Sequence, residues 1–384
     1  MKGRGGLRGV ACVTHVSPVH PMGDTRILYK EASALAAEGY DVAVAAAEEP
    51  IDLCEDVRAV ELRLPTKRFL RVVISPWIAL CAALRVRADV YHLHDPEILW
   101  IGPLLKLVTG AKILFDVHEN VVAQIKTKHW ISRWLRRPLG CLYRSLERVL
   151  LPVYDSVILA EDSYAPLYRW HPRAVVIHNY PITSCACAPY THDEGGLRLV
   201  YVGRMDGSRG ALTMLEAAVA LKHRGVEVTW HLAGLAAPEL DGEMREFIIS
   251  RGLERNVFLA GRLSFPEAMR LVACADLGIS VLSPLPNYVE SMPTKLLEYL
   301  AAGIPVIASD FALWRSLLER FECGIAIPAD DSEALAAAVE KLASAPGLRK
   351  RMGEAGRKRL LESGMTWEAE SQKLLHLYEG ILGE

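Results

Sequence analysis

Two glutamates, Glu290 and Glu298, are separated by seven residues in the segment NYVESMPTKLLEYLAAGIPVIASD. The segment predicts a helix that starts near its Pro-Thr-Lys triplet, and a helix start offers free backbone N–H groups and partial positive charge to a phosphate. Glu298, in the second turn, would accept hydrogen bonds from a sugar diol such as ribose, and Glu290 would stand before the helix. A plain amphipathic helix with solvated glutamates explains the same spacing. The residues at the helix start are Pro293, Thr294 and Lys295.

Two arginines, Arg204 and Arg209, lie in the loop GRMDGSRG directly after the apolar run 199–202. Two guanidinium groups placed after a strand would clamp a diphosphate with paired hydrogen bonds. The alternative is a pair of solvated arginines on a surface loop.

A third polar group, His94 and Asp95, ends the predicted strand 90–93 in the sequence HLHDPE. Ligands of α/β proteins collect at the carboxyl edge of the sheet, so this pair is a candidate for binding an acceptor. Capping of the following helix by Asp95 is the alternative.

These groups need a scaffold, and short β-branched runs alternate with helical patterns along the whole chain. That rhythm predicts an α/β fold with parallel sheets covered by helices on both faces. The polar stretch 183–196 interrupts the rhythm and is predicted to be a linker between domains at 1–182 and 197–366. The segment 367–384 has the pattern of an amphipathic helix. The expected strands are 10–16, 42–46, 90–93, 113–115, 156–159 and 175–177 before the linker, and 199–202, 228–233, 257–260, 277–281 and 306–308 after it.

The sequence lacks the motifs of several common nucleotide, hydrolase and zinc sites. The chain has no Gly-Lys dipeptide and hence no P-loop, and it has no GxSxG elbow. The glycines at 3, 5, 6 and 9 precede the first strand, where a dinucleotide fingerprint cannot lie. Eight scattered cysteines, with only Cys185 and Cys187 close together, give no zinc pattern, so we expect no metal and a reducing cytoplasm.

The charge total also conceals an asymmetry. The 384 residues carry a formal net charge of −2, which argues against a nucleic-acid partner. Residues 66–87 nevertheless hold five basic side chains and no acid, and residues 126–148 hold seven with Glu147 as the single acid. Tryptophans lie among them, a mixture that suits an anionic membrane surface as well as a solvated face. The longest apolar run has 13 residues, too short to span a bilayer, so attachment to such a surface would be peripheral, on the inner face of the membrane.

The motifs together resemble family 4 of the retaining glycosyltransferases. PTKLLEYLAAGIPVIASD is similar to the family's E-x7-E signature, and the supporting motifs occur in the family's order. The resemblance implies the GT-B fold, in which two Rossmann-like domains turn their parallel sheets toward an interdomain cleft. Residues 1–182 would bind the acceptor, 197–366 would bind the nucleotide-sugar, and the helix 367–384 would cross back to the first domain. The supporting motifs are DTRILYKEASALAAEGYDV (24–42), HLHDPEIL (92–99), FDVHEN (115–120), VIHNYP (176–181), YVGRMDGSRG (201–210) and FLAGRL (258–263).

The resemblance implies a role for several residues of the first domain. His118 would act at the reaction centre, with Asp116 and Glu119 orienting it or binding acceptor hydroxyls; a buried core histidine is the alternative. Gly23 would let the backbone approach the donor phosphates, although relatives often have two glycines where this chain has Met-Gly, and Asp24 after it also suits a helix N-cap.

The second domain would hold the donor. Arg204, Arg209 and the helix start would neutralise the diphosphate, although relatives have lysine at the position of Arg209. Glu298 would hold the ribose, and Glu290 would position donor hydroxyls or stabilise developing positive charge. The residues implied to flank the base are Gly261, Arg262 and Leu263.

The resemblance implies a metal-independent hexosyltransferase without a cofactor that moves a sugar from a UDP-sugar, in preference to a GDP-sugar, to a glycan or a lipid-linked acceptor in cell-surface polysaccharide synthesis. Two alternatives remain. A sugar-nucleotide 2-epimerase shares the fold and needs no acceptor, and a non-catalytic partner would bind the nucleotide-sugar without turnover.

Overall fold

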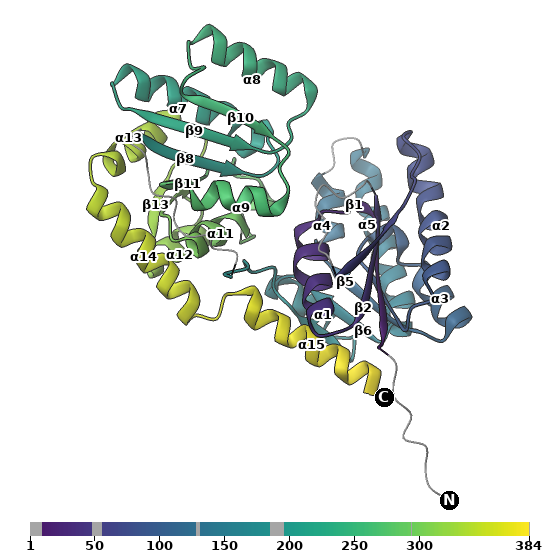
Figure 1. Cartoon of the computed structure of the whole chain (residues 1–384). Helices are drawn as coiled ribbons and strands as arrows, with labels where there is room; N and C mark the ends of the chain where they lie inside the picture. The colour runs from purple at the N-terminus through teal and green to yellow at the C-terminus, as the bar shows by residue number, and fades with distance from the viewer. Residues whose placement is uncertain (1–9, 48–55, 128–130, 185–195, 293, 384) are drawn as a thin grey trace, which may run out of the picture. The chain divides into compact units, whose positions relative to one another are not determined.

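A computed structural model describes residues 10–47, 56–127, 131–184, 196–292 and 294–383. The predicted linker is described only at its ends, and Cys185, Cys187 and Pro293 lie outside the described residues. The chain divides into two compact units (Figure 1). Unit 1 runs to Asn179 and is completed by the chain from Ala369 onward, and unit 2 is Tyr180–Glu368.

Unit 1 is built on a seven-stranded parallel sheet with the order β3-β2-β1-β4-β5-β6-β7. The strand order reverses between β1 and β4, and the loops at the carboxyl ends of two such strands form the usual ligand crevice of an open α/β sheet. The strands are β1 (Cys12–Pro21), β2 (Asp41–Ala47), β3 (Val57–Glu61), β4 (Val90–Leu93), β5 (Lys112–Val117), β6 (Ser156–Leu159) and β7 (Ala174–Val176).

Alternate side chains of these strands face two different layers. Tyr91 and Leu93 of β4 join the apolar cluster beneath α2 (Arg68–Val86) and α3 (Ile101–Thr109), whereas His92 between them contacts Tyr378 of α15 (Trp367–Gly383). Figure 1 shows α1 and α15 on one side of the sheet and α2 and α3 on the other. The helices are η1 (Thr25–Ala32), a π-helix, and α1 (Ser33–Ala37), α2 (Arg68–Val86), α3 (Ile101–Thr109), α4 (Val121–Thr127), α5 (Arg133–Leu150), α6 (Ala165–Tyr168) and α15 (Trp367–Gly383), with short 3₁₀ turns at Pro96–Ile98, Leu151–Val153 and Asp162–Tyr164.

Unit 2 repeats the plan with a six-stranded parallel sheet in the order β10-β9-β8-β11-β12-β13, which reverses between β8 and β11. Residues of α7, α8 and α13 pack on one face, and residues of α9, α11 and α12 pack on the other. The strands are β8 (Leu197–Val202), β9 (Val228–Ala233), β10 (Val257–Gly261), β11 (Leu277–Ser280), β12 (Val306–Ser309) and β13 (Gly324–Ile327). The helices are η5 (Gly207–Arg209), α7 (Ala211–His223), α8 (Pro238–Ser250), α9 (Phe265–Ala273), α10 (Pro286–Val289), α11 (Thr294–Ala302), α12 (Ala312–Phe321), α13 (Ser332–Ala343) and α14 (Pro346–Glu362).

The predicted α/β class with two parallel sheets is confirmed. The sequence patterns missed two edge strands: β3, whose side chains are mostly exposed and give no apolar run, and β13, a short apolar run of mostly half-buried residues. They also ended β1 too early: the strand continues from Val16 to Pro21 through polar residues. The predicted α-helix after β1 begins instead as the π-helix η1, and π-helical turns are frequent at functional sites.

Candidate active site

In unit 2, the switch between β8 and β11 gathers basic side chains. Arg204 is exposed directly after β8, Arg209 ends η5 with 29% of its side chain exposed, and Lys295 stands in the first turn of α11. The Tyr201 hydroxyl donates to the carbonyl of Arg204 at 2.7 Å, and the Lys295 Nζ lies 3.9 Å from the centre of the same tyrosine ring. The side chains of Lys295 and Arg209 therefore lie beside Tyr201, and Arg204 follows β8 at the same sheet edge, where phosphates commonly bind.

The Lys295 ammonium is the unusual member of this group. Its Nζ is buried and has no hydrogen-bond partner among the described residues. Burial, reinforced by the positive charge of Arg209, lowers the pKa of Lys295 to about 7. A buried amine that has no hydrogen-bond partner in the described part of the chain and lies beside Arg209 is suited to receive an anion from outside the chain.

Arg209 is held by Tyr288 and Asp206. Its Nε donates to the Tyr288 hydroxyl at 3.4 Å and lies 3.6 Å from an Asp206 carboxylate oxygen. The next residue, Gly210, has a φ of +72°, and a Cβ there would stand 2.3 Å from the carbonyl oxygen of Val281. Only glycine fits this close approach of the loop to Val281, the residue after β11, and this fixes the backbone next to Arg209.

The two glutamates of the E-x7-E pattern lie on different elements. Glu290 is exposed and forms the C-cap of α10, while Glu298 is half-buried on α11. The Tyr299 hydroxyl accepts from the Val202 amide at 3.1 Å and donates to the Ile279 carbonyl at 3.3 Å. These bonds fix α11 to β8 and β11, and with it the orientation of Glu298.

The residues expected near the base follow β10. Gly261 has a φ of +65°, and its carbonyl already accepts from the Gly234 amide at 2.7 Å. Arg262 is exposed and Leu263 is half-buried. Ser264 then caps α9 through a reciprocal pair with Glu267, which ends the loop.

In unit 1, His118 follows β5 and lies at the border of the interior, with 13% of its side chain exposed. Its Nε2 is 2.8 Å from an Asp116 carboxylate oxygen and 3.0 Å from the Nδ1 of His94. Asp116 also accepts two hydrogen bonds from Arg26, at 2.7 and 2.9 Å. Burial alone would raise the pKa of Asp116, but Arg26 and His118 hold it well below its ordinary range. The anionic carboxylate thus fixes the His118 ring.

Asp95 is engaged inside the protein. Its carboxylate accepts from the Ser17 hydroxyl at 2.7 Å and the Val19 amide at 2.9 Å, and it pairs with His20 at 2.8 Å. Burial alone would lower the pKa of His20, but the Asp95 bond and charge raise it to about 9. The alternative that Asp95 caps a helix is wrong, because its side chain makes no bond to the 3₁₀ turn that follows.

The acceptor candidates of the sequence therefore divide into two groups. His94, Asp95 and Asp116 have buried side chains bonded to other residues of unit 1, so they can act by positioning their neighbours and not by direct contact. Glu119 is exposed and can reach a ligand.

Gly23 does not need to be glycine for its backbone. Its φ lies outside the left-handed region, and a Cβ there would meet nothing within 4 Å. Asp24 is the N-cap of η1, as the alternative predicted, since its side chain accepts from the amides of Arg26 and Ile27.

Several site residues escaped sequence reasoning. Arg26 and Glu31 sit in what looks like an ordinary amphipathic helix, yet both are buried. Tyr201 and Tyr288, which contact Lys295 and Arg209, are single aromatic residues in a strand and a short helix.

Two groups of side chains in unit 1 could hold a metal ion. The first is His15, Glu31, His92 and His94, and the second is His94, Asp116 and His118.

Comparison with known proteins gives matches across most of the chain. The family model described as "Glycosyl transferases group 1" matches residues 188–359, and that described as "Glycosyltransferase Family 4" matches residues 23–180. Phosphatidyl-myo-inositol mannosyltransferase of Mycobacterium leprae is 25% identical over 315 residues, covering 76% of this chain and 74% of that protein. Alpha-D-kanosaminyltransferase of Streptomyces kanamyceticus is 30% identical over 158 residues, covering 41% of this chain and 39% of that relative. The crystal structure of Anabaena HepE in complex with UDP and glucose matches with a TM-score of 0.64 at 14% identity, over 96% of this chain and 100% of that one.

Proposed function

Because the chain belongs to the family 4 glycosyltransferases and has their GT-B fold, we propose that it transfers a sugar, with retention of configuration, from a UDP-sugar to a glycan or lipid-linked acceptor. The proposed pathway is the synthesis of a cell-surface polysaccharide or glycolipid. A UDP donor accords with the ligand of the HepE structure, and a lipid-linked acceptor accords with the name of the mycobacterial relative.

The observation that carries the proposal is the cationic group of unit 2. Arg209 and Lys295 lie together at the start of α11, where backbone N–H groups add positive potential, and Arg204 is exposed in the loop directly after β8. Fixed cations of this kind stabilise the negative charge that develops on a departing diphosphate. Transfer by this route needs no divalent metal at the donor.

The proposed reaction is a substitution on one face of the sugar. The bond from the anomeric carbon to the phosphate oxygen breaks, and the acceptor oxygen bonds to the same carbon. The acceptor's proton passes to the leaving phosphate, so no strong enzymatic base is required. Glu298 holds the ribose, Glu290 positions donor hydroxyls, and His118, oriented by Asp116, contacts the reacting sugar. Gly23 and Thr294 offer backbone near the phosphates, Gly261, Arg262 and Leu263 flank the base, and Glu119 binds acceptor hydroxyls.

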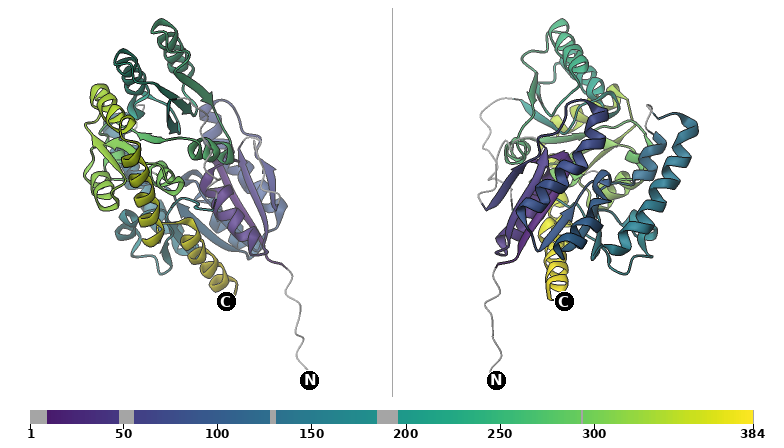
Figure 2. Two further views of the ribbon diagram at one scale, coloured as in Figure 1. Left: turned by 60° about the vertical axis from the view of Figure 1, so that its left-hand side comes forward. Right: turned by 90° about the vertical axis from the view of Figure 1, so that its right-hand side faces the viewer.

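The surface of unit 1 supports a lipid-linked acceptor. On α5, an exposed stripe of large apolar residues includes Trp134 (75% exposed) and Val149 (71% exposed), with Leu142 and Leu146 between them. An adjoining stripe carries arginines, and α2 exposes Trp77 beside further apolar side chains. Figure 2 shows both helices on the outside of the unit. Within the described residues, no helix is long and apolar enough to cross a bilayer. We infer that α5 lies on an anionic membrane surface.

Arg204→Ala tests the donor site. We expect a loss of at least about 100-fold in acceptor-dependent UDP release, because one cation that stabilises the leaving group is gone. Arg255→Ala, an exposed arginine elsewhere in unit 2, is the matched control and should keep wild-type turnover. Equal rates for both variants would refute the assignment of the diphosphate site.

Sedimentation with vesicles of an anionic phospholipid tests the membrane surface. Charge reversal at the exposed residues Arg133, Arg137 and Arg148 should abolish co-sedimentation, and the matched reversal at Lys350, Arg351 and Lys358 of α14 should leave it intact. Equal binding by both triple variants would overturn the inference for α5.

A further inference from the structure

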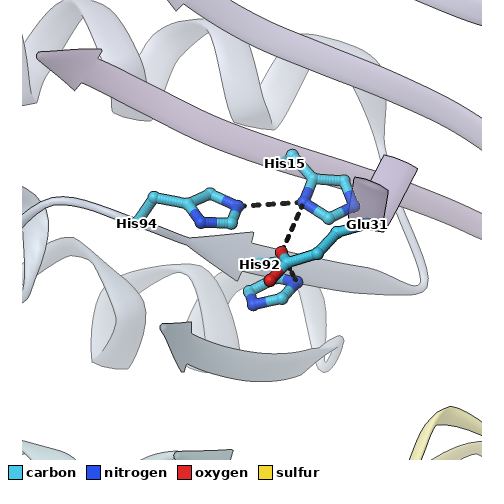
Figure 3. A group of neighbouring side chains, drawn as sticks. All are labelled: His15, Glu31, His92 and His94. Carbon is cyan, nitrogen blue, oxygen red and sulfur yellow. Dashed lines mark hydrogen bonds and ion pairs between the residues drawn. The ribbon is translucent and has the colours of Figure 1, made fainter. Parts of the chain in front are cut away.

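Four side chains of unit 1 meet in a cluster without solvent contact: His15, Glu31, His92 and His94 (Figure 3). The His15 Nδ1 lies 2.9 Å from the His94 Nε2 and 3.9 Å from an oxygen of Glu31. The same oxygen of Glu31 lies 3.7 Å from the His92 Nδ1. Each residue offers a donor atom, and these atoms all lie within 4.8 Å of one another.

The fold builds this cluster from three elements. His15 of β1 and His92 of β4 are direct partners in the parallel register, and His94 follows two residues later on the same face. That face is turned away from the apolar cluster of α2 and α3, toward η1 and α15. Glu31, in the last turn of η1, contacts the histidines on this face of the sheet. The cluster therefore lies at the strand switch of unit 1, where ligand sites concentrate.

The polar atoms of the cluster are poorly satisfied by the protein. Among the described residues, the buried side-chain atoms without a hydrogen-bond partner include the His15 Nε2, the His92 Nε2 and both carboxylate oxygens of Glu31. The Arg26 Nε lies 3.0 Å from one of these oxygens, but it donates its single hydrogen to Asp116. Buried polar groups are normally paired, so the Glu31 carboxylate, which faces the Nδ1 atoms of His15 and His92, indicates a missing cation. The Nε2 atoms of these two histidines point away from that position and would not be ligands.

We propose that His15, Glu31, His92 and His94 bind a transition-metal ion of the Zn²⁺ type. Three imidazoles and one carboxylate form a ligand set typical of zinc, whereas Mg²⁺ and Ca²⁺ select oxygen ligands. Donor atoms around a tetrahedral zinc stand about 3.3 Å apart, given bond lengths of about 2.0–2.1 Å. The separations of 2.9, 3.7 and 3.9 Å lie on both sides of this value. The sequence indicated no metal site because histidines on neighbouring strands have no recognisable spacing.

The neighbours of the cluster suit metal ligation. The Nδ1 of His94 points away from His15, toward an Asp116 oxygen at 3.4 Å and the His118 Nε2 at 3.0 Å. A carboxylate behind a ligating imidazole fixes its ring and raises its basicity. The Tyr378 hydroxyl of α15 lies 3.0 Å from the His92 Nδ1, the atom that faces Glu31, so it would stand beside the proposed ion and not behind the imidazole ring. The ion would thus tie β1, β4 and η1 together directly behind His118, with a structural role separate from the donor site.

Metal analysis of the full chain, purified without a polyhistidine tag, tests the proposal. We expect about one zinc-type ion per chain by inductively coupled plasma mass spectrometry, retained through gel filtration. In chain stripped with a chelator, added Zn²⁺ should raise the melting temperature, and added Co²⁺ should give the visible absorption of a tetrahedral nitrogen–oxygen site. These readouts do not use transfer activity, so they can fail or succeed independently of the proposed glycosyltransferase reaction.

Variants locate the ion. Glu31→Gln and His92→Gln should each weaken Zn²⁺ binding by more than about 100-fold, since even loss of a supporting residue weakens metal sites by about 10–100-fold. His376→Gln, an exposed histidine of α15 outside the cluster, is the matched control and should bind like the wild type.

Two results would overturn the proposal. A metal-free chain in which neither Zn²⁺ nor Co²⁺ binds would show that the cluster is a hydrogen-bond ladder from His15 through His94 to His118. Retention of the ion by both cluster variants would place it elsewhere. If a variant does not fold, the Co²⁺ spectrum of the wild-type chain decides alone.

Discussion

The buried amine of Lys295 makes donor binding depend on pH in a calculable way. With a pKa of about 7, this side chain is largely uncharged at pH 8 in the free protein. Burial is the main cause of the lowered pKa, Arg209 of η5 lowers it further, and Glu298 of the same helix and Asp206 raise it; the Tyr201 ring of β8 covers the amine. A diphosphate placed beside it favours the charged form, so binding takes up a proton above pH 7.

The magnitude follows from linkage. Each pH unit above the free pKa weakens binding by up to about tenfold, which is about 1.4 kcal/mol, until the pKa of the complex is reached. Between pH 7.5 and 9.5 we therefore expect the dissociation constant of UDP to rise by up to about 100-fold. Below pH 7 the amine is already charged in the free protein, and its contribution to the pH dependence disappears.

Isothermal titration calorimetry with UDP measures both the proton uptake on binding and the change of the dissociation constant with pH. Titrations at pH 8 in two buffers of different ionisation enthalpy should report an uptake of nearly one proton, and the series from pH 7.5 to 9.5 should give the slope. Lys295→Met, which keeps the length of the side chain without the charge, should bind more weakly at pH 7 and lose the slope. Arg255→Met is the matched control. The same slope in Lys295→Met as in the wild type would refute the reasoning.

Three further predictions concern the scaffold. Gly210→Ala should cost about 2–4 kcal/mol of unfolding free energy in urea and weaken UDP binding, because the new Cβ meets the Val281 carbonyl at a positive φ; unchanged stability would show that the loop adapts freely. Arg26→Met should destabilise the chain by about 3–5 kcal/mol in the same assay, since it leaves Asp116 charged and buried without its arginine partner. The double variant Arg26→Met, Asp116→Asn should recover part of the lost stability. No recovery would contradict the pairing of the two side chains. Glu370→Gln should cost about 1–3 kcal/mol at pH 7, because the carboxylate accepts from the His178 amide at 2.9 Å and pairs with Lys373 at 2.8 Å. Burial alone would raise the pKa of Glu370, but the His178 imidazole, Lys373 and the His178 amide lower it. The contribution of Glu370 to stability is therefore present above its ordinary pKa and lost as the pH falls through the lowered value. A deficit that persists at pH 2 would exclude this origin.

Much of the scaffold was predictable because its strands are buried on both faces. Such strands read as short apolar runs, and the predicted bounds 90–93, 156–159 and 228–233 agree with β4, β6 and β9. Motifs that follow such an apolar run lie at the carboxyl edge of the sheet, as His118 does after β5 and Arg204 after β8. The edge strand β3 was missed because most of its side chains are exposed, whereas the edge strands β7 and β10 still have apolar runs and were predicted.

Burial of charged side chains was not predictable from spacing. Arg26 and Glu31 occupy η1, and the π-helical turn places both on the inner face. Lys295 at a helix start reads as a surface lysine, and only the fold places Tyr201 over its ammonium. The burial of these side chains depends on which residues lie opposite them on neighbouring elements. Local sequence does not determine the register between strands that are distant in the chain.

The most direct test of the account is acceptor-dependent release of UDP. The full chain is incubated with a panel of UDP-sugars and a membrane lipid extract, and the product is analysed by nuclear magnetic resonance. We predict that one donor gives UDP only when the extract is present, that the linkage keeps the donor's anomeric configuration, and that Arg204→Ala abolishes it. Release of an epimerised sugar without the extract, or an inverted linkage in the product, would contradict the proposed reaction.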